Sequence, residues 1–248
     1  MKAMILAAGR GVRLRPLTDT IPKALMDIGG APMLETILKR LSAAGVTEVI
    51  INTHHLADKL TDFIRNKNHA GLKVEISREA CFPLETGGGL KKAAWFFKDG
   101  GPFFLYNCDV LTDMDLSAMF ADHLKSGALA TLAVKERQSS RQLLFDPDLT
   151  LRGRFHAGED TARWAGKPLS GLISLAFSGV HVISPEIFPL MTESGVFSIT
   201  DVYLRLAGVG AKIKGFRMDG YYWRDIGSLE KLEEVRRHVA EQKTVVSD

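Results

Sequence analysis

The sequence predicts a single α/β domain built on a doubly wound, mixed but mainly parallel sheet with an added antiparallel β section. Three observations lead to this prediction. The chain has 248 residues, a length at which one α/β domain can bury a sizeable core. Strand-like apolar runs alternate with amphipathic helical patterns up to about residue 134, as in βαβ units. From about residue 140 the alternation breaks into short β-like runs separated by turn residues.

The first half supplies the parallel strands and their crossover helices. The predicted strands are short apolar runs at residues 2–6, 49–52, 72–77, 102–106 and 129–134. The predicted helices carry apolar side chains at helical spacing at residues 32–44, 56–64, 87–97 and 116–125. Pro32 is expected as the first residue of the first helix, and Gly45 is expected to end it. This order implies right-handed crossovers.

The second half is expected to lay antiparallel strands and hairpins beside that sheet. Its β-like runs lie at residues 143–146, 151–155, 172–177, 180–183 and 212–217. Helices are expected at residues 199–207 and 229–241, the latter with Ser228 as its N-cap. Residues 242–248 are expected to form a frayed tail.

Composition restricts the possible partners. The formal net charge is +3, the hydrophobic fraction is 46% and the charged fraction is 25%, which is ordinary for a soluble globular protein. No dense basic run suggests nucleic acid or an acidic membrane surface. Cys81 and Cys108 lack metal-ligand spacing and are expected as reduced thiols. The apolar run near the amino terminus is too short for a signal peptide or a membrane span, so a cytoplasmic protein is expected.

A glycine-rich loop follows the first predicted strand, within residues 6–25. Gly9 and Gly11 allow backbone amides to line an anion site, and Arg13 and Lys23 add positive charge. Such a loop suits a triphosphate. A dinucleotide fingerprint would need a glycine at Leu14 and a helix opening there, and no P-loop ending exists in the chain. An ordinary glycine-rich turn with surface cations is the alternative.

These residues resemble the signature of the sugar-1-phosphate nucleotidyltransferases. Residues 7–13 match its small-small-Gly-x-Gly-x-Arg loop, and residues 22–25 match its Pro-Lys-x-Leu segment. The resemblance implies a Rossmann-like fold in which Arg13 and Lys23 are catalytic. It also implies nucleotide contacts from the loop residues Leu6, Ala7, Ala8, Gly9 and Gly11.

Two aspartates are candidate magnesium ligands. Asp109 follows the fourth predicted strand, which in a doubly wound sheet lies beside the first strand, so its carboxylate should reach the crevice of the glycine loop. A carboxylate beside a triphosphate calls for a cation between them, and Mg²⁺ fits that role. Asp225 lies in a Trp-Arg-Asp-Ile-Gly-Ser stretch that resembles the family's Trp-x-Asp-x-Gly-Thr metal motif. The alternative is that Asp109 only caps the next turn and that Asp225 is a simple cap near a helix start.

Two further segments resemble substrate-binding parts of the family. In residues 84–89, three glycines at a predicted helix start should leave N–H groups free and allow a base or sugar to approach. The resemblance makes Thr86 and Gly87 nucleotide contacts, with Glu85 as a sugar-side or loop-holding residue. Gly179 matches the glycine of a sugar-binding strand. Residues 166–168 keep only part of a Glu-Lys-Pro sugar motif, which leaves the sugar open.

Other constellations carry weaker alternatives. His54 and His55 follow the second predicted strand without metal-site spacing, and satisfied or solvent-facing histidines are expected. Asp113 and Asp115 have the Asp-x-Asp form of metal-dependent glycosyltransferases, although helix caps are the preferred interpretation. A catalytically silent nucleotide-binding regulator is a third possibility, but it predicts a lost phosphate or metal residue, and none is lost.

The resemblance extends from Lys2 to about Glu241 and is closest to the N-acetylmuramate-1-phosphate uridylyltransferase branch, with Cys108 replacing the usual glycine before the metal aspartate. It implies a nucleotide-binding half at residues 1–134 and a sugar-phosphate-binding half at 135–241. The implied reaction joins a nucleoside triphosphate, UTP by preference, to a sugar 1-phosphate, N-acetylmuramate 1-phosphate by preference. The products are an NDP-sugar and pyrophosphate, and glucose 1-phosphate or mannose 1-phosphate is the alternative substrate.

Overall fold

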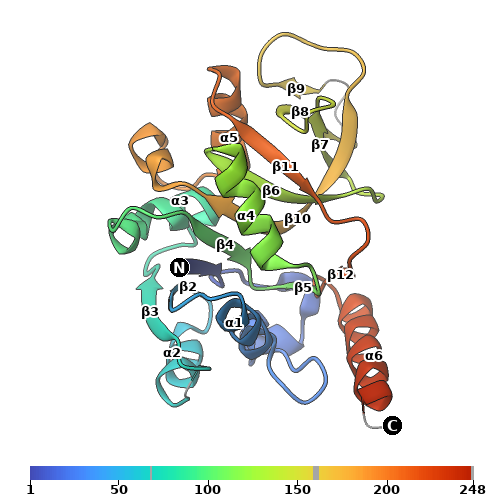
Figure 1. The fold of residues 1–248 in the computed structure, drawn as a ribbon. Coiled ribbons are helices and arrows are strands. Elements are labelled where there is room, and N and C mark those ends of the chain that lie inside the picture. Colours follow the sequence, from blue (N-terminus) through green and yellow to red (C-terminus); the bar gives the residue numbers. More distant parts are fainter. Residues whose placement is uncertain (68, 159–161, 247–248) are drawn as a thin grey trace. The chain divides into compact units, whose positions relative to one another are not determined.

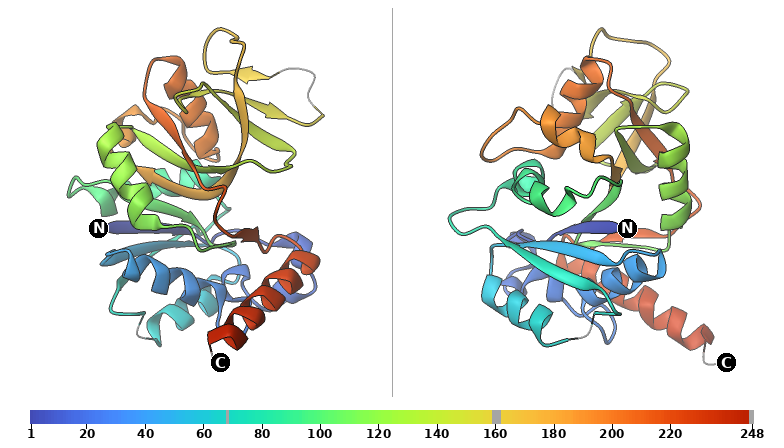
Figure 2. Two further views of the ribbon diagram at one scale, coloured as in Figure 1. Left: turned by 45° about the vertical axis from the view of Figure 1, so that its right-hand side comes forward. Right: turned by 60° about the vertical axis from the view of Figure 1, so that its left-hand side comes forward.

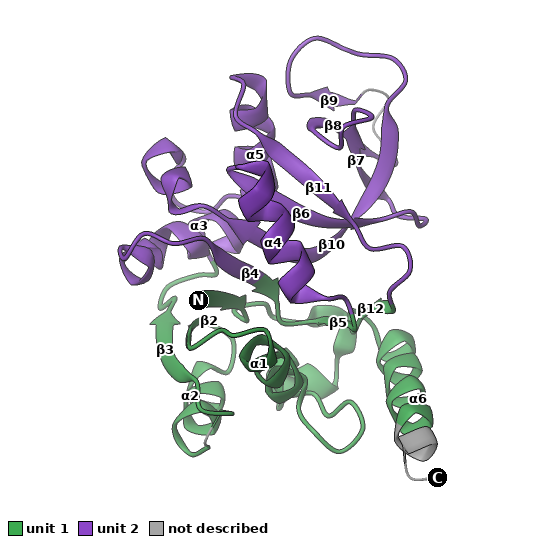
Figure 3. Cartoon of the chain, in the orientation of Figure 1, with its two compact units in different colours: residues 1–83, 106–113, 222–248 green, residues 84–105, 114–221 purple. Residues whose placement is uncertain are grey.

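A computed structural model describes residues 1–67, 69–158 and 162–246 of the chain (Figure 1). Contacts divide the chain into two compact units that interleave along the sequence (Figure 3). Unit 1 holds Met1–Pro83, Tyr106–Asp113 and Tyr222–Asp248, and unit 2 holds Leu84–Leu105 and Met114–Tyr221. The expected division into a nucleotide-binding half at residues 1–134 and a sugar-phosphate-binding half at residues 135–241 stays a prediction. Residues 247–248 of the expected tail lie outside the described residues.

Unit 1 contains three of the five strands predicted in the first half, and these three are parallel, whereas the strand predicted at residues 129–134 lies in unit 2 and pairs antiparallel with its long neighbour. The three strands of unit 1 are β1 (Lys2–Leu6), β2 (Glu48–Thr53) and β3 (Lys73–Arg78), in the order β3-β2-β1. In the parallel register Ile5 lies opposite Ile51, and Ile51 lies opposite Ile76. The end of β4 (Phe103–Asn107) follows next to β1, as predicted. β1 and β2 are largely buried because most of their side chains are apolar on both faces, whereas β3 leaves Lys73, Glu75 and Arg78 exposed.

Two helices, α1 (Met33–Ala43) and α2 (Ala57–Arg65), connect these strands and lie on the same side of them (Figures 1 and 2). Each buries an apolar stripe, which in α1 includes Leu34, Ile37 and Leu41. The structure differs slightly from the prediction at the start of α1: Pro32 is the capping residue before the helix and not its first residue. Gly45 follows the end of α1 in a left-handed conformation, as expected.

Two short strands of unit 1 were not predicted from the sequence. β5 (Val110–Thr112) pairs antiparallel with β12 (Trp223–Asp225), and α6 (Leu229–Val246) follows β12. Ser228 Oγ accepts a hydrogen bond from the backbone N of Lys231 at 3.4 Å, which agrees with its predicted N-cap role. α6 continues beyond the predicted end at Glu241. The β5–β12 pair brings two distant segments of the sequence together.

Unit 2 contains the mostly antiparallel section. Its strands are β6 (Ala130–Lys135), β7 (Arg141–Phe145), β8 (Leu151–His156), β9 (Arg163–Trp164), β10 (Ile173–Ile183) and β11 (Ile213–Arg217). β10 pairs antiparallel with β6 and β7, while β11 pairs parallel with β6. The two runs expected at residues 172–177 and 180–183 form one strand, because Gly179 adopts a φ of +82° within a bulge that keeps the strand continuous.

The helices of unit 2 are α3 (Glu85–Lys92), α4 (Leu116–Ser126) and α5 (Ile199–Gly208). α4 contacts β6 and β10, and α5 contacts β8, β11 and α3. Phe97 and Phe103 stack with ring centroids 3.8 Å apart, and Phe103 also stacks on Phe188 at 5.8 Å. α3 begins at Glu85, earlier than predicted, so its glycines lie inside the helix.

The predicted fold class is confirmed: an α/β chain with parallel strands and an added antiparallel section. In the part of the chain that the structure describes, no helix is both long and apolar enough to cross a membrane.

Candidate active site

The glycine loop after β1 is irregular but firmly held. It contains three short 3-10 turns, Val12–Leu14, Leu17–Asp19 and Lys23–Leu25, and no α-helix, in agreement with the exclusion of a dinucleotide fingerprint that would open a helix at Leu14. Gly11 has a φ of +61°, and the hydroxyl of Thr18 donates to its carbonyl oxygen at 2.9 Å. A Cβ at Gly11 would lie 2.8 Å from the Thr18 methyl carbon, whereas a Cβ at Gly9 would meet nothing within 4 Å. The loop therefore stays open at Gly9.

Buried polar groups from β2 and its neighbours support this loop. Asn52 Oδ1 accepts from the Ala7 backbone N at 2.6 Å, and Asn52 Nδ2 donates to Glu79 Oε1 at 2.8 Å. His55 Nε2 lies 2.8 Å from the carbonyl oxygen of Thr18. The expectation that His54 and His55 are satisfied is confirmed, since His54 also contacts a backbone carbonyl. The N–H of Ala7 is engaged with Asn52, so any contact of Ala7 with a ligand must use its other atoms.

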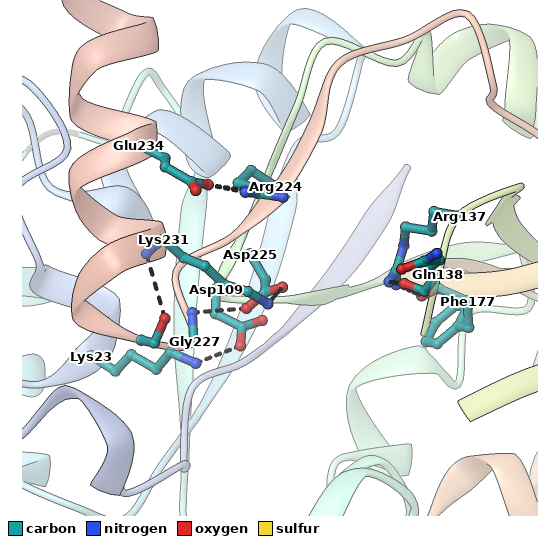
Figure 4. Close-up of polar contacts among 11 residues, drawn as sticks. Lys23, Asp109, Arg137, Gln138, Phe177, Arg224, Asp225, Gly227, Lys231 and Glu234 are labelled. Carbon is teal, nitrogen blue, oxygen red and sulfur yellow. Dashed lines mark hydrogen bonds and ion pairs between the residues drawn. The ribbon is translucent and has the colours of Figure 1, made fainter. Parts of the chain in front are cut away.

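Asp109 and Asp225 lie side by side at the paired strands β5 and β12 (Figure 4). Asp225 is opposite Val110 in the strand register, and the backbone N of Ile226 donates to the carbonyl oxygen of Asp109 at 2.9 Å. Cys108 donates its backbone N–H to Leu6 at 3.2 Å, which ties this segment to the end of β1. The sequence prediction that these two aspartates converge therefore agrees with the structure.

A lysine contacts each of these carboxylates (Figure 4). Lys23 Nζ lies 2.5 Å from Asp109 Oδ2, with 13% of the lysine side chain exposed. Lys231 Nζ lies 2.6 Å from Asp225 Oδ2. Lys231 was not predicted from the sequence, because no motif marks it. The available signal was its place in the first turn after the Ser228 cap, which turns it back toward Asp225.

Arg13 completes the cluster through Gly227. A Cβ at Gly227 would collide with Oδ1 of Asp225 and would lie 3.0 Å from a guanidinium nitrogen of Arg13. The Gly227 backbone N donates to Asp225 Oδ1 at 2.8 Å. Only glycine allows the guanidinium and the carboxylate to flank this position so closely. Arg13, Lys23, Asp109 and Asp225, which were predicted as one site, all lie in unit 1.

The surroundings shift the pKa values of two side chains in the site, Asp225 and Cys108. Burial alone would raise the pKa of Asp225, but the hydrogen bond and charge of Lys231, the Gly227 amide and the charge of Lys23 together lower it. Burial raises the pKa of the Cys108 thiol to about 12, with the charge of Asp109 adding to the effect. Cys108 is therefore a neutral packing group beside Asp109, not a nucleophile.

The two carboxylates fit a magnesium ion. Mg²⁺ prefers oxygen ligands and is commonly held by one or two carboxylates together with phosphate oxygens of a substrate. Asp109 and Asp225 supply such a pair. Among the residues that the structure describes, no group of three or more His, Cys, Asp or Glu side chains could hold a metal. The remaining ligands would have to come from substrate and water.

The glycines of α3 in unit 2 differ from their prediction. The N–H groups of Gly87 and Gly88, expected to be free, both donate to the carbonyl oxygen of Phe197, at 2.9 and 3.3 Å. Thr86 Oγ1 accepts from the Ile199 backbone N at 2.9 Å. A Cβ at Gly87 would lie 2.5 Å from the Phe197 ring. These residues therefore pack α3 against the start of α5, and nucleotide contact by Thr86 and Gly87 stays a prediction.

The remaining predicted residues fall into two groups. Glu85 is exposed at the start of α3 with a φ of +58°, and Gly179 is buried in the bulge of β10; their sugar-binding roles stay predictions. Asp115 caps α4 by accepting from the Ala118 backbone N at 2.9 Å, and Asp113 accepts from the Tyr222 backbone N at 2.7 Å. The preferred interpretation of Asp115 as a helix cap is confirmed, and Asp113 instead holds the segment that leads into β12.

The chain matches known proteins over nearly its whole length. Residues 2–242 match the family model described as "Nucleotidyl transferase". This chain belongs to the nucleotidyl transferase family. The family and the enzyme class predicted from the signature motifs are thereby confirmed.

Two curated relatives and one solved structure illustrate the likeness. The chain is 36% identical over 238 residues to the N-acetylmuramate alpha-1-phosphate uridylyltransferase of Neisseria meningitidis serogroup B, covering 95% of this chain and 97% of that protein. It is 31% identical to the enzyme of the same name from Caulobacter vibrioides, covering 96% and 97%. A crystal structure of UDP-glucose pyrophosphorylase complexed with UDP-glucose superposes with a TM-score of 0.79 at 20% identity, covering 97% and 98%. That likeness concerns the fold.

Proposed function

We propose that this chain is a magnesium-dependent uridylyltransferase that joins UTP to N-acetylmuramate 1-phosphate and releases pyrophosphate. The observation that carries the proposal is the convergence of Arg13, Lys23, Asp109 and Asp225 beside the open glycine loop in unit 1. Cations and a carboxylate pair at one place suit a reaction on a polyphosphate. The choice of UTP and of this sugar is supported by the names of the two relatives that match nearly the full chain.

The proposed reaction is a direct displacement. A phosphate oxygen of the sugar 1-phosphate attacks the α-phosphorus of UTP, and the bond from that phosphorus to the bridging oxygen breaks. UDP-sugar forms, and pyrophosphate leaves with the electron pair. No enzyme nucleophile is needed. Such reactions depend mainly on positioning and on neutralisation of charge.

Each charged residue has a defined task in this scheme. Arg13 and backbone amides of the glycine loop hold the departing pyrophosphate, and Lys23 holds the α-phosphate while staying close to Asp109. Asp109 and Asp225 would hold Mg²⁺. The ion supplies Lewis-acid charge stabilisation at the reacting phosphate oxygens when bound. The nucleotide would contact Thr86 and Gly87, and the sugar would contact Glu85 and Gly179. We place this activity in the cytoplasm, in the recycling of cell-wall sugar.

Pyrophosphate release tests this function. The purified chain is supplied with Mg²⁺, each of the four common nucleoside triphosphates and a panel containing N-acetylmuramate, N-acetylglucosamine, glucose and mannose 1-phosphates. We expect the fastest release with UTP and N-acetylmuramate 1-phosphate, and a UDP-sugar of matching mass. Preference for glucose 1-phosphate or mannose 1-phosphate would redirect the sugar assignment. Absence of release from every pair would overturn the enzyme proposal.

The glycosyltransferase alternative has less support. It requires Asp113 and Asp115 to hold a metal together, yet each accepts a hydrogen bond from a backbone amide within its own unit. A glycosyltransferase would also consume a nucleotide-sugar without releasing pyrophosphate. The same assay therefore separates the two functions.

A further inference from the structure

Lys231 is a cation at the site to which neither the sequence motifs nor the proposed reaction gives a task. It lies in the first turn of α6, where Ser228 caps its backbone N–H. Its ammonium group reaches back to Asp225 Oδ2 at 2.6 Å, and 18% of the Asp225 side chain is exposed. The other oxygen of Asp225 accepts from the Gly227 backbone N. Both oxygens of this proposed magnesium ligand thus have protein partners.

Each carboxylate of the cluster is neutralised by a lysine. Asp109 is paired with Lys23 at 2.5 Å, and Asp225 is paired with Lys231 at 2.6 Å. Arg13 beside Gly227 adds a further positive charge. A dication that approaches this cluster alone meets two neutralised carboxylates and the extra positive charge of Arg13, so it gains no net electrostatic attraction. Mg²⁺ also gives up its water reluctantly, which makes weak attraction insufficient.

A bound triphosphate reverses this balance, because it brings several negative charges and further oxygen ligands. We propose that Lys231 is a positioning residue that holds Asp225 until the dication arrives together with the nucleotide. The chain then does not load the metal ahead of its substrate. This inference rests on the proposed function, because it takes Asp109 and Asp225 as the metal ligands.

Binding of Mn²⁺ to the nucleotide-free protein tests the proposal. Free Mn²⁺ is measured by its electron paramagnetic resonance signal for the wild type, Lys231→Met and Lys231→Arg. We expect Lys231→Met to bind Mn²⁺ about tenfold more tightly than the wild type, since a charge that competes for Asp225 is removed. Lys231→Arg should stay close to the wild type. With a non-hydrolysable UTP analogue present, the difference between wild type and Lys231→Met should shrink to about threefold or less.

The controls identify the site and exclude a general charge effect. Lys39→Met removes a lysine of the same unit that pairs with Glu35 at 3.0 Å on the surface, and it should leave Mn²⁺ binding unchanged. Asp225→Asn in the Lys231→Met background should remove the gain. Lys231→Gln, followed with a thermal melt, provides a second uncharged variant should Lys231→Met fold poorly.

The proposal is overturned if neither uncharged variant binds Mn²⁺ more tightly than the wild type, or if Lys39→Met gives the same gain. This measurement needs no turnover. A tighter Lys231→Met site in a protein that releases no pyrophosphate would reject the proposed function while supporting the role of Lys231. Full pyrophosphate release by the wild type, together with Mn²⁺ binding that Lys231→Met leaves unchanged, would support the proposed function and reject the role of Lys231.

Discussion

The glycines of unit 1 and the glycines of α3 in unit 2 look alike in sequence but have different surroundings. At Gly9 the space that a side chain would fill is open, and at Gly227 it is bounded by Arg13 and Asp225. At Gly87 and Gly88 that space is filled by the ring of Phe197 and the carbonyl oxygen of Gly195. The N–H groups of Gly87 and Gly88 donate to the carbonyl oxygen of Phe197, a packing contact, whereas the N–H group of Gly227 donates to the carboxylate of Asp225 within the site.

The difference teaches what makes a glycine-rich segment a candidate binding site. A glycine whose missing side chain leaves room for charged groups or for solvent can serve a ligand. A glycine whose missing side chain leaves room for another part of the same chain serves packing. Substitutions in the two regions should therefore separate into losses of activity and losses of stability.

The largest effect is expected for Lys23→Met. Lys23 contacts Asp109 and is the cation assigned to the α-phosphate, so its loss removes a contact that strengthens in the transition state. We expect pyrophosphate release to fall by a hundredfold or more, corresponding to roughly 3–4 kcal/mol. Steady-state rates with saturating UTP and sugar phosphate measure this.

A lysine on the other glycine segment provides the matched control. Lys91 in α3 donates to the carbonyl oxygens of Met191 and Glu193, at 2.7 and 2.5 Å. Lys91→Met should lower the unfolding free energy while leaving the rate of the folded protein within about threefold of the wild type. Equal rate losses for Lys23→Met and Lys91→Met would remove the distinction between the two regions.

Gly227→Ala should give the next largest effect. The new methyl group would collide with Asp225 Oδ1 and press on the Arg13 guanidinium, so the two charged groups must move apart. Displacement of reacting groups by about 1 Å can lower rates by about a hundredfold. We expect a loss of at least tenfold in kcat with a small change in the melting temperature. A variant that retains wild-type kcat would contradict the placement of Asp225 in the site.

The sequence was sufficient to predict the structure where local patterns or long motifs mark it. The apolar runs of β1 and β2 and the amphipathic pattern of α1 predicted the parallel strands and their helices. The convergence of Asp109 and Asp225 followed from the strand order and from motifs that resemble a known family. These features depend on residues that are close in the chain or form a recognisable pattern.

What the sequence did not predict depends on long-range contacts between short segments. β5 and β12 have three residues each and stabilise one another across a long separation, so neither has a local signal. The packing role of Gly87 depends on Phe197, which is distant in sequence. Lys231 acquires its partner only when α6 begins just after β12.

Gly88→Ala should affect stability more than activity. Its Cβ would collide with the carbonyl oxygen of Gly195, and the packing of unit 2 would have to adjust. Overpacking of this kind costs about 1–3 kcal/mol. Urea unfolding should show this loss, while kcat of the folded protein stays near that of the wild type. A hundredfold loss of kcat at unchanged stability would instead favour a nucleotide role for this helix.

A buried histidine in unit 2 should make stability depend on pH. Burial lowers the pKa of His181 to about 3, and its Nδ1 lies 2.9 Å from the Tyr203 hydroxyl. In the unfolded chain the histidine pKa is about 6.5, so below this pH the unfolded chain binds a proton at His181 and the folded chain does not. The unfolding free energy should therefore fall as the pH drops below about 6.5, by about 2 kcal/mol between pH 7 and pH 5.

The variant His181→Gln isolates this contribution. Glutamine keeps a polar group for Tyr203 but does not titrate, so the variant's unfolding free energy should change less over the same range. His123, whose pKa is also lowered by burial, contributes to both proteins and cancels in the difference. Urea unfolding at several pH values measures the two slopes, and parallel slopes would contradict a lowered pKa of His181 in the folded state.

The smallest effect is expected for Asp115→Ala. This variant tests whether the Asp115 carboxylate caps α4 or binds a metal ion. Asp115 accepts from the Ala118 backbone N at 2.9 Å at the start of α4, and loss of such a cap costs about 1 kcal/mol. Activity should stay within about twofold, because no step of the proposed reaction uses this carboxylate. Asp115→Asn keeps a capping oxygen and should recover the lost stability. If both variants instead abolish a metal-dependent activity, the Asp113 and Asp115 pair holds the ion, and a glycosyltransferase becomes the better assignment.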